Sequence, residues 1–275
     1  MSPDDLAFVV ALCGLQAGLN IAADRTYSTE TRLTALARRQ GLVSAEAVIA
    51  AARHPSQARL RWRIVEAMAA GETSFFRDRA FFEHLRDGLL PGLGEARKGS
   101  RLRLWSAGCA TGQEAYSLAI LAEEAAETWG DRADVYASDI NSAELQRARS
   151  GLFSQSEVQR GLPIRLLIRH FEKVGEDWQA SPELRARLRW RRLNLAARFE
   201  EIGSFDVILC RYVLSRMDAP GRIRALASLR RALAPDGTLA LGMDETIAEI
   251  GDFFLADAGP PGIYRSRPRP AIAAA

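Results

Sequence analysis

Lysine is nearly absent from this sequence, which contains 37 lysine and arginine residues in all. Lys98 and Lys173 are the two lysines, so arginine carries almost all of the positive charge. Either a compositional bias or selection for forked contacts with anions gives this pattern. The net charge of +3 is too small to indicate a nucleic-acid partner without a local basic face.

Cysteine and histidine are also scarce, with three residues of each type. Cys13, Cys109 and Cys210 lie far apart in the sequence, and none of them stands beside a histidine. This spacing fits neither a zinc site nor a disulfide framework. We therefore expect no metal ion and a reducing, cytoplasmic setting.

Long apolar runs are missing as well. None approaches the roughly 18 residues that a membrane-spanning helix requires. The first residues, MSPDDLAFVVALCGLQAGLN, include an apolar run, but Asp4 and Asp5 precede it where a signal peptide carries basic residues. We expect neither a signal peptide nor a membrane span.

The residues that are present change in character along the chain. In residues 1–68, apolar residues recur at helical spacing in DLAFVVALCGL, TRLTALARR and RLRWRIVEAMAA, which predicts an N-terminal domain of three or four short helices. Ser28 and Thr29 are candidate caps for the second helix, Gly41 for its end, and Ser44 for the start of the third. Residues 69–99 are expected to link this domain to the rest.

Short apolar strands alternate with amphipathic helices from residue 100 to 265. The strands are RLRLWSA, ADVYAS, FDVILC and TLALGM, and the helices include GQEAYSLAILAEEAAETWG and PGRIRALASLRRALAPDG. This alternation predicts an α/β domain with a Rossmann-like parallel sheet covered by helices on both faces. Residues 153–192 interrupt the alternation and are predicted to form a small antiparallel β insertion, and residues 266–275 a loose tail.

The turn GCATG follows the first strand, at the end of the sheet where such folds bind ligands. Gly108 and Gly112 let the backbone pass close to a ligand. The second strand ends at Asp139, whose carboxylate offers acceptors for ribose hydroxyls. A tight structural turn and a helix N-cap are the alternative interpretations of these two features.

The start of the next helix bears on the choice of ligand. Glu114 stands in its first turn, and a carboxylate there repels the pyrophosphate of a dinucleotide. The same carboxylate attracts a ligand that carries positive charge and no phosphate. S-adenosylmethionine, with its sulfonium and ammonium groups, meets this requirement better than NAD does.

Several motifs occur in the order seen in chemotaxis receptor methyltransferases of the CheR type, which this sequence resembles from about residue 15 to 245. The motifs are ETSFFRD, WSAGCATGQEAYSLAI, ASDINSAELQRARSGLF, LNL and FDVILCRYVL. The segment AGLNIAADRTYSTETRLTALARRQGL also resembles the N-terminal helical domain of that family.

The resemblance implies a function and partners. Members of the family are protein-glutamate methyltransferases, which use S-adenosylmethionine to form glutamate γ-methyl esters on chemoreceptors and release S-adenosylhomocysteine. It implies a methyltransferase domain over residues 100–265, in which residues 153–192 are a β-subdomain that docks a receptor tail in some members. The expected partners are the cytoplasmic helices of methyl-accepting chemoreceptors. We expect no nucleic acid, contact with the membrane only through the receptor, and a monomer.

The resemblance also implies site residues. Arg77, Tyr212 and Arg216 are expected at the reacting centre, and the Phe pairs of FFRDRAFF are expected to pack the linker onto the sheet domain. Positions expected to bind the cofactor are Gly71, Thr73, Arg77, Gly108, Glu114, Asp139, Asn194, Leu195, Arg211 and Tyr212. Arginines of the second helical segment are expected to face an acidic receptor helix, with a solvated basic face as the alternative: Arg25, Arg32, Arg38 and Arg39.

Four departures separate this chain from the family pattern. Gly71 replaces an Asn, GQEA replaces GEEP, GMDE replaces GHSE, and Tyr212 and Arg216 replace the Asn and Tyr of CRNVLIYF. A catalytically weakened module that binds S-adenosylmethionine or a receptor is therefore the alternative function. Methyl transfer to a small molecule or RNA, and NAD-dependent oxidoreduction, rank below it.

No histidine-centred base is expected, because a glutamate acceptor is already ionised at neutral pH. The three histidines are interpreted as structural: His54, His84 and His170.

Overall fold

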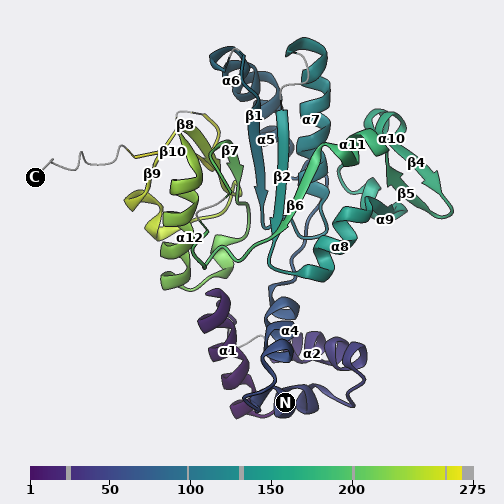
Figure 1. Cartoon of the computed structure of the whole chain (residues 1–275), viewed down its shortest axis with the longest axis vertical. Coiled ribbons are helices and arrows are strands. Elements are labelled where there is room, and N and C mark those ends of the chain that lie inside the picture. Colours follow the sequence, from purple (N-terminus) through teal and green to yellow (C-terminus); the bar gives the residue numbers. More distant parts are fainter. Residues whose placement is uncertain (23–25, 98, 130–132, 200–201, 258, 268–275) are drawn as a thin grey trace, which may run out of the picture.

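The structure, a computed structural model, describes residues 1–22, 26–97, 99–129, 133–199, 202–257 and 259–267. Helices form an N-terminal unit at one end of the molecule (Figure 1). They are α1 (Pro3–Ala17), α2 (Thr26–Gln40), α3 (Ala45–Arg53) and α4 (Ala58–Ala69). Their apolar faces meet in one cluster, in which Leu33, Ile49 and Ile64 are fully buried. The all-α N-terminal part predicted from the helical spacing is confirmed.

The ends of these helices follow local chemistry. The Ser2 hydroxyl accepts a hydrogen bond from the Asp5 backbone N–H at 3.2 Å, and Ser44 caps α3 in the same way. Gly41, with φ of 69°, follows the last residue of α2 as predicted. The predicted N-cap of α2 is wrong. Because α2 begins at Thr26, Ser28 and Thr29 lie inside the helix, and Thr29 is buried.

A seven-stranded sheet forms the centre of the larger part, in the order β6-β2-β1-β7-β8-β10-β9. Neighbouring strands from β6 to β8 are parallel, whereas β10 runs antiparallel to β8 and β9. The Rossmann-like α/β class is therefore confirmed. The strands are β1 (Leu102–Ala107), β2 (Ala133–Asp139), β6 (Leu188–Arg192), β7 (Phe205–Leu209), β8 (Leu233–Ala240), β9 (Phe254–Ala256) and β10 (Ile263–Ser266).

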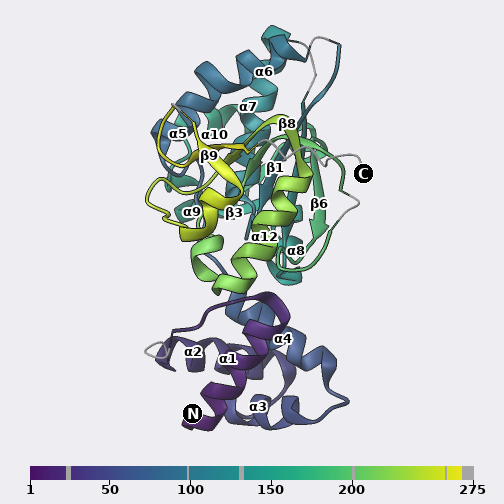
Figure 2. The same ribbon diagram turned by 90° about the vertical axis from the view of Figure 1, so that its left-hand side faces the viewer.

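Helices cover both faces of this sheet, each through its own apolar cluster. One cluster joins the sheet to α5, α6 and α7, and the other joins it to α12. The helical elements that accompany the large sheet are α5 (Arg79–His84), a π-helical turn (Leu85–Leu89), α6 (Leu90–Ala96), α7 (Gln113–Trp129), α8 (Ser142–Ser150), a 3-10 turn η3 (Leu214–Arg216), α12 (Ala219–Ala232) and a 3-10 turn η4 (Ala248–Asp252). The four N-terminal helices lie beyond the end of the sheet where the parallel strands finish (Figure 2).

A second, three-stranded antiparallel sheet lies beside the first, in the order β3-β5-β4. Its elements are β3 (Leu152–Ser154), α9 (Gln155–Gln159), α10 (Ile164–His170), β4 (Phe171–Val174), β5 (Asp177–Ala180) and α11 (Pro182–Ala186). The predicted antiparallel insertion is thus present. The last part of the predicted range 153–192 differs, because β6 pairs in parallel with β2 and belongs to the large sheet.

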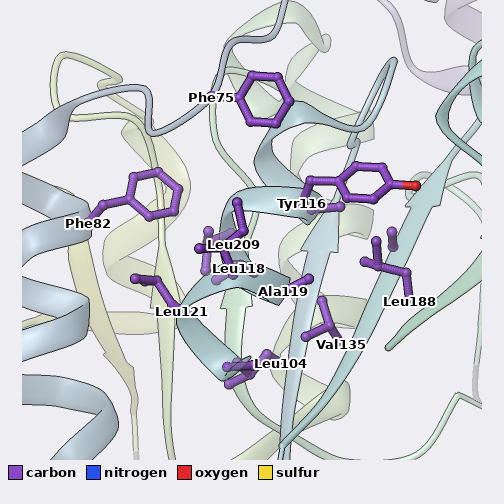
Figure 3. Close-up of a cluster of buried hydrophobic side chains, with 14 of the residues drawn as sticks. Phe75, Phe82, Leu104, Tyr116, Leu118, Ala119, Leu121, Val135, Leu188 and Leu209 are labelled. Atoms are coloured by element: carbon purple, nitrogen blue, oxygen red, sulfur yellow. The ribbon is translucent and has the colours of Figure 1, made fainter. Parts of the chain in front are cut away.

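The linker between the two parts passes from α4 to α5 and is held by aromatic packing. Phe75 is fully buried, with its ring 5.0 Å from Phe153 and 5.7 Å from Phe171, centroid to centroid. Figure 3 places Phe75 and Phe82 in the same apolar cluster as Tyr116 of α7. The Phe residues therefore pack the linker against both the small sheet and the α/β core, and not against the N-terminal helices.

Candidate functional site

A cavity of about 390 Å³ opens where the parallel strands end, between the large sheet and the N-terminal helices. The first turn, the end of β2, the segment after β6 and the loop after β7 form its floor, and the ends of α1 and α4 form its roof. Of the ten positions expected to bind the cofactor, eight line it: Gly71, Arg77, Gly108, Asp139, Asn194, Leu195, Arg211 and Tyr212. Arg32 and Arg216 line it too.

The glycine turn after β1 approaches the loop after β7 closely. Gly108 has φ of 84°, and a Cβ there would lie 2.5 Å from Cγ2 of Val213. The N–H groups of Gly108 and Cys109 both donate to the carbonyl of Ser138, which ties this turn to the end of β2. Only glycine combines this conformation with so short a separation, so the first turn requires Gly108.

Asp139 at the end of β2 is a buried carboxylate on the cavity floor. Its Oδ2 accepts from the Ala110 N–H at 2.9 Å and its Oδ1 from the Asn141 N–H at 2.8 Å. Burial raises the pKa of Asp139, and these two backbone bonds oppose the rise. Because an ionised carboxylate has about four lone-pair positions, both oxygens can still accept a ligand hydroxyl.

Glu114 lies behind the cavity wall and is paired. Its Oε1 accepts from the Ser106 hydroxyl at 2.7 Å and its Oε2 from Nη1 of Arg211 at 3.0 Å. The sequence argument for an acidic, cation-attracting crevice is therefore wrong in part. Glu114 is neutralised, and the acidic cavity-lining residues, Asp139 and Glu72, stand among four arginines: Arg32, Arg77, Arg211 and Arg216.

Arg211 is itself buried, with 5% of its surface exposed. Besides Glu114 it bonds through Nη2 to the Arg77 carbonyl at 2.8 Å and to Oδ2 of Asp78 at 2.5 Å. Burial acts against the ionised form of Asp78, but the hydrogen bond from Tyr212 and the charge of Arg211 prevail and lower its pKa. This network fixes the linker residues 77 and 78 to the loop after β7.

Two arginines close the C-terminal end of α4. Nη1 of Arg32 donates to the carbonyls of Ala67, Met68 and Ala70 at 2.9 to 3.1 Å. Arg216 donates to the carbonyls of Ala69 and Met68 at 2.9 and 3.0 Å. These bonds satisfy carbonyls that have no partner inside the helix, and positive charge there complements the helix dipole.

Backbone contacts also join the N-terminal helices to the sheet part. Leu19 forms an isolated antiparallel bridge with Met217, and the Asp218 N–H donates to the Gly18 carbonyl at 2.7 Å. The Asn194 side chain donates through Nδ2 to the Gln16 carbonyl at 2.8 Å. Part of the hydrogen-bonding capacity of Asn194 is thus used to hold the end of α1 over the cavity.

The arginines expected to face the receptor occupy different surroundings. Arg38 and Arg39 are exposed in the last turn of α2, whereas Arg32 is half-buried and points to α4. Arg25 falls outside the described residues. Thr73 is half-buried in the linker, two residues before the buried Phe75.

Several residues of the site were not singled out from the sequence. Asp78 bonds Tyr212 and Arg211, and its place in the RDR cluster was the available signal. Glu245, which bonds the loop after β7, stands in GMDE, the divergent form of a family motif. Glu144 lies beside Asp139, Arg216 and Arg32, and no pattern in the sequence distinguished it from a helix-surface glutamate.

The described residues form neither a metal site nor a disulfide. It contains no group of three or more His, Cys, Asp or Glu residues arranged to hold a metal ion. The three cysteines are free and buried. Across the same residues, no helix combines the length and the apolar character needed to cross a bilayer.

The chain is similar to one protein family and to proteins of known name. Residues 71–258 match the family described as CheR methyltransferase, SAM binding domain. The chain is 32% identical over 266 residues to the chemotaxis protein methyltransferase 1 of Pseudomonas aeruginosa, a match that covers 94% of this chain and 95% of that protein. It is 30% identical to chemotaxis protein methyltransferase Cher2 of Pseudomonas putida, with the same coverage.

Among solved structures, a TehB-like SAM-dependent methyltransferase from Corynebacterium glutamicum is 15% identical and has a TM-score of 0.39. The match covers 77% of this chain and 97% of that one.

Proposed function

Because the chain belongs to the CheR methyltransferase family, we propose that it methylates glutamate side chains of chemoreceptors, with S-adenosylmethionine as methyl donor and a γ-methyl ester as product. The observation that carries this proposal is the cavity at the ends of β1 and β2. Its walls come from the matched residues 71–258 and also from the N-terminal helices.

The residues of the cavity suit this cofactor. Asp139 offers free lone pairs for ribose hydroxyls, and Leu193, Leu195 and Val213 give an apolar wall for an adenine ring. Arg77, which also lines the cavity, suits the carboxylate of the methionine end. The volume of about 390 Å³ falls in the range of ordinary small-molecule sites.

The chemistry that the bound cofactor supplies is an electrophilic methyl group on a sulfonium. The acceptor carboxylate is ionised at neutral pH, so the protein need not remove a proton. Its contribution is to hold the acceptor oxygen in line with the methyl group and to exclude water. We assign Arg77 to hold a carboxylate in the cavity, and we assign the roof formed by α1 and α4 to exclude water.

We assign Arg38 and Arg39 to the guidance of the acidic acceptor, because both are exposed and lie in one turn of α2. Charges of this kind raise the association rate more than the final affinity. Neutralising both should raise KM for receptor membranes at low salt and have little effect at high salt. An equal effect at both salt concentrations would contradict this assignment.

A non-catalytic signalling module of the same fold is the second candidate. It is favoured by Arg216, which replaces the family tyrosine near the reacting centre and whose guanidinium bonds the end of α4. In this alternative, the cavity binds S-adenosylmethionine or S-adenosylhomocysteine and the N-terminal helices bind a receptor, without methyl transfer.

Two measurements on the full chain separate these functions. Calorimetry with S-adenosylhomocysteine tests binding, and transfer of labelled methyl from S-adenosylmethionine to membranes of the source strain tests catalysis. We expect binding together with label that is released by base, as a methyl ester is. Binding of S-adenosylhomocysteine without base-labile label would support the signalling module. The absence of such binding would exclude both candidate functions.

A further inference from the structure

Tyr212 adopts a backbone conformation that is unfavourable for a bulky residue. Its φ is 59°, in the left-handed region, where aromatic residues are outliers that cluster at functional sites. The buried carboxylate of Glu245 holds this conformation. Its Oε2 accepts from the N–H groups of Tyr212 at 2.6 Å and Gly242 at 3.1 Å, and its Oε1 accepts from Ser215 at 2.9 Å.

The ring of Tyr212 is fixed on two further sides. It lies against Gly242, where a Cβ would be 2.5 Å from Cε1 of the ring. Its hydroxyl donates to Oδ2 of Asp78 at 2.6 Å. The ring therefore cannot move toward Gly242 without displacing the backbone there. Its hydroxyl is held by the linker residue Asp78.

The exposed face of this ring carries the guanidinium of Arg77. The distance from Cζ of Arg77 to the ring centroid is 3.7 Å, and both residues line the cavity. Such stacking is an attraction between a cation and the negative face of the ring. Donation of the phenol proton to Asp78 increases the electron density of the ring and so strengthens the attraction.

Arg77 keeps most of its hydrogen-bonding capacity. Among the described residues its side chain makes one hydrogen bond, from Nη1 to the Glu72 carbonyl at 3.4 Å, whereas a guanidinium has five N–H donors. Stacking fixes the plane of the group and leaves its edge for a ligand. The ligand that matches a planar fork of donors is a carboxylate.

We propose that Tyr212 is a positioning residue that holds the Arg77 guanidinium toward a carboxylate in the cavity. This inference rests on the proposed function, because the two expected ligands, the acceptor glutamate and the methionine end of the cofactor, both carry that group. A ring that only filled space would need neither the hydroxyl bond to Asp78 nor the stacked guanidinium of Arg77. It also follows that the Asn usual at this position in the family cannot replace Tyr212 in this chain without weakening carboxylate recognition.

The test compares Tyr212→Asn with Tyr212→Phe in the full chain. Asn is among the residues that best tolerate the left-handed conformation, so Tyr212→Asn removes the ring while the backbone keeps its shape. Tyr212→Phe keeps the ring and loses the bond to Asp78. A cation–ring attraction of the usual size corresponds to an effect of about 2- to 30-fold.

We expect Tyr212→Asn to melt no lower than the wild type and to weaken carboxylate recognition by about 2- to 30-fold, with a smaller effect for Tyr212→Phe. If Tyr212→Asn raises KM for receptor membranes, the carboxylate that Arg77 holds is that of the acceptor glutamate. If it raises Kd for S-adenosylhomocysteine, that carboxylate belongs to the methionine end of the cofactor.

A double-mutant cycle with Arg77→Met shows whether Tyr212 acts through Arg77. We expect Tyr212→Asn to have no further effect in the Arg77→Met background. Full additivity of the two changes, or unchanged KM and Kd in Tyr212→Asn, would overturn the inference. Failure of the wild type to bind S-adenosylhomocysteine would instead remove the proposed function, so the two failures are distinct.

Discussion

Gly18, just after α1, lies against Gly221 in the first turn of α12, so closely that a Cβ on Gly18 would be 2.7 Å from the Cα of Gly221. The contact sits beside the Leu19–Met217 bridge and the bond from Asp218 to Gly18. Two glycines thus allow the backbone of the N-terminal helices to touch the backbone of the sheet part. The roof of the cavity depends on this approach.

The first prediction concerns this contact. Gly221→Ala should lower the free energy of unfolding by roughly 1 to 3 kcal/mol, because the new methyl group meets backbone atoms that cannot easily move. Denaturant unfolding provides the measurement. Gly92→Ala is the matched control, since Gly92 is also helical and a Cβ there meets nothing within 4 Å. The control should be stabilised by about 0.5 to 1 kcal/mol, and a similar gain for Gly221→Ala would contradict the proposed contact.

The second prediction concerns Glu144. Burial, followed by repulsion from Asp139, raises its pKa from 4.5 to about 7. Between pH 4.5 and 7, Glu144 therefore holds a proton in the folded chain that it releases in the unfolded chain. The free energy of unfolding accordingly falls as pH rises through this range. Because Gln does not titrate, Glu144→Gln should abolish this fall, and at pH 8 its free energy of unfolding should exceed that of the wild type by roughly 1 to 3 kcal/mol.

Unfolding measured across the pH range tests the sign as well as the size of this effect. The difference between Glu144→Gln and the wild type should be small at pH values below the pKa of the unfolded glutamate and should grow toward neutrality. A constant difference at all pH values would mean that Glu144 does not titrate in this range.

The third prediction concerns the cavity floor. Asp139→Ala should weaken S-adenosylhomocysteine binding by roughly 1 to 3 kcal/mol, because the ribose hydroxyls of the bound ligand lose their acceptor. Calorimetry provides the measurement, and Asp134→Ala serves as control because it lies at the opposite end of β2, paired with Arg101. Equal affinity in the two variants would refute the placement of the ribose beside Asp139.

The fourth prediction separates two arginines of α2. Arg32→Met should cost roughly 1 to 3 kcal/mol of stability, since three carbonyls at the end of α4 lose a shared donor. Arg39→Met, at an exposed position of the same helix, should change stability by less than about 0.5 kcal/mol. Thermal unfolding of the two variants tests this, and equal melting points would show that the α4 bonds contribute nothing.

Features fixed by local chemistry were predictable from the sequence. The glycine turn at 108 and the carboxylate at the end of β2 each follow from a short stretch of residues, and the parallel sheet follows from the alternation of strands and helices over residues 100–265. Ser44 and Gly41 likewise cap helices as predicted. The α2 start was missed because Thr29, a good cap by type, instead belongs to the buried face of a helix that begins at Thr26.

Pairings between distant residues were not predictable in the same way. Glu114 was interpreted as a free acidic group, but Arg211, 97 positions away, neutralises it. Arg32 was assigned to the substrate from its charge and Arg216 to the reacting centre from the family resemblance, whereas both bond the end of α4. An ionisable side chain reveals its charge in the sequence, but only the fold determines which opposite charge or carbonyl it meets.

The bridge between Leu19 and Met217 has a consequence for how the molecule divides. The segment that matches the family begins at residue 71, yet Ala17 and Leu19 form part of the cavity wall. A fragment trimmed to residues 71–258 would keep the parallel strands but lose β10, and it would lack the N-terminal residues of the cavity wall. The smallest portion able to enclose a cofactor is therefore larger than the portion by which the family is identified.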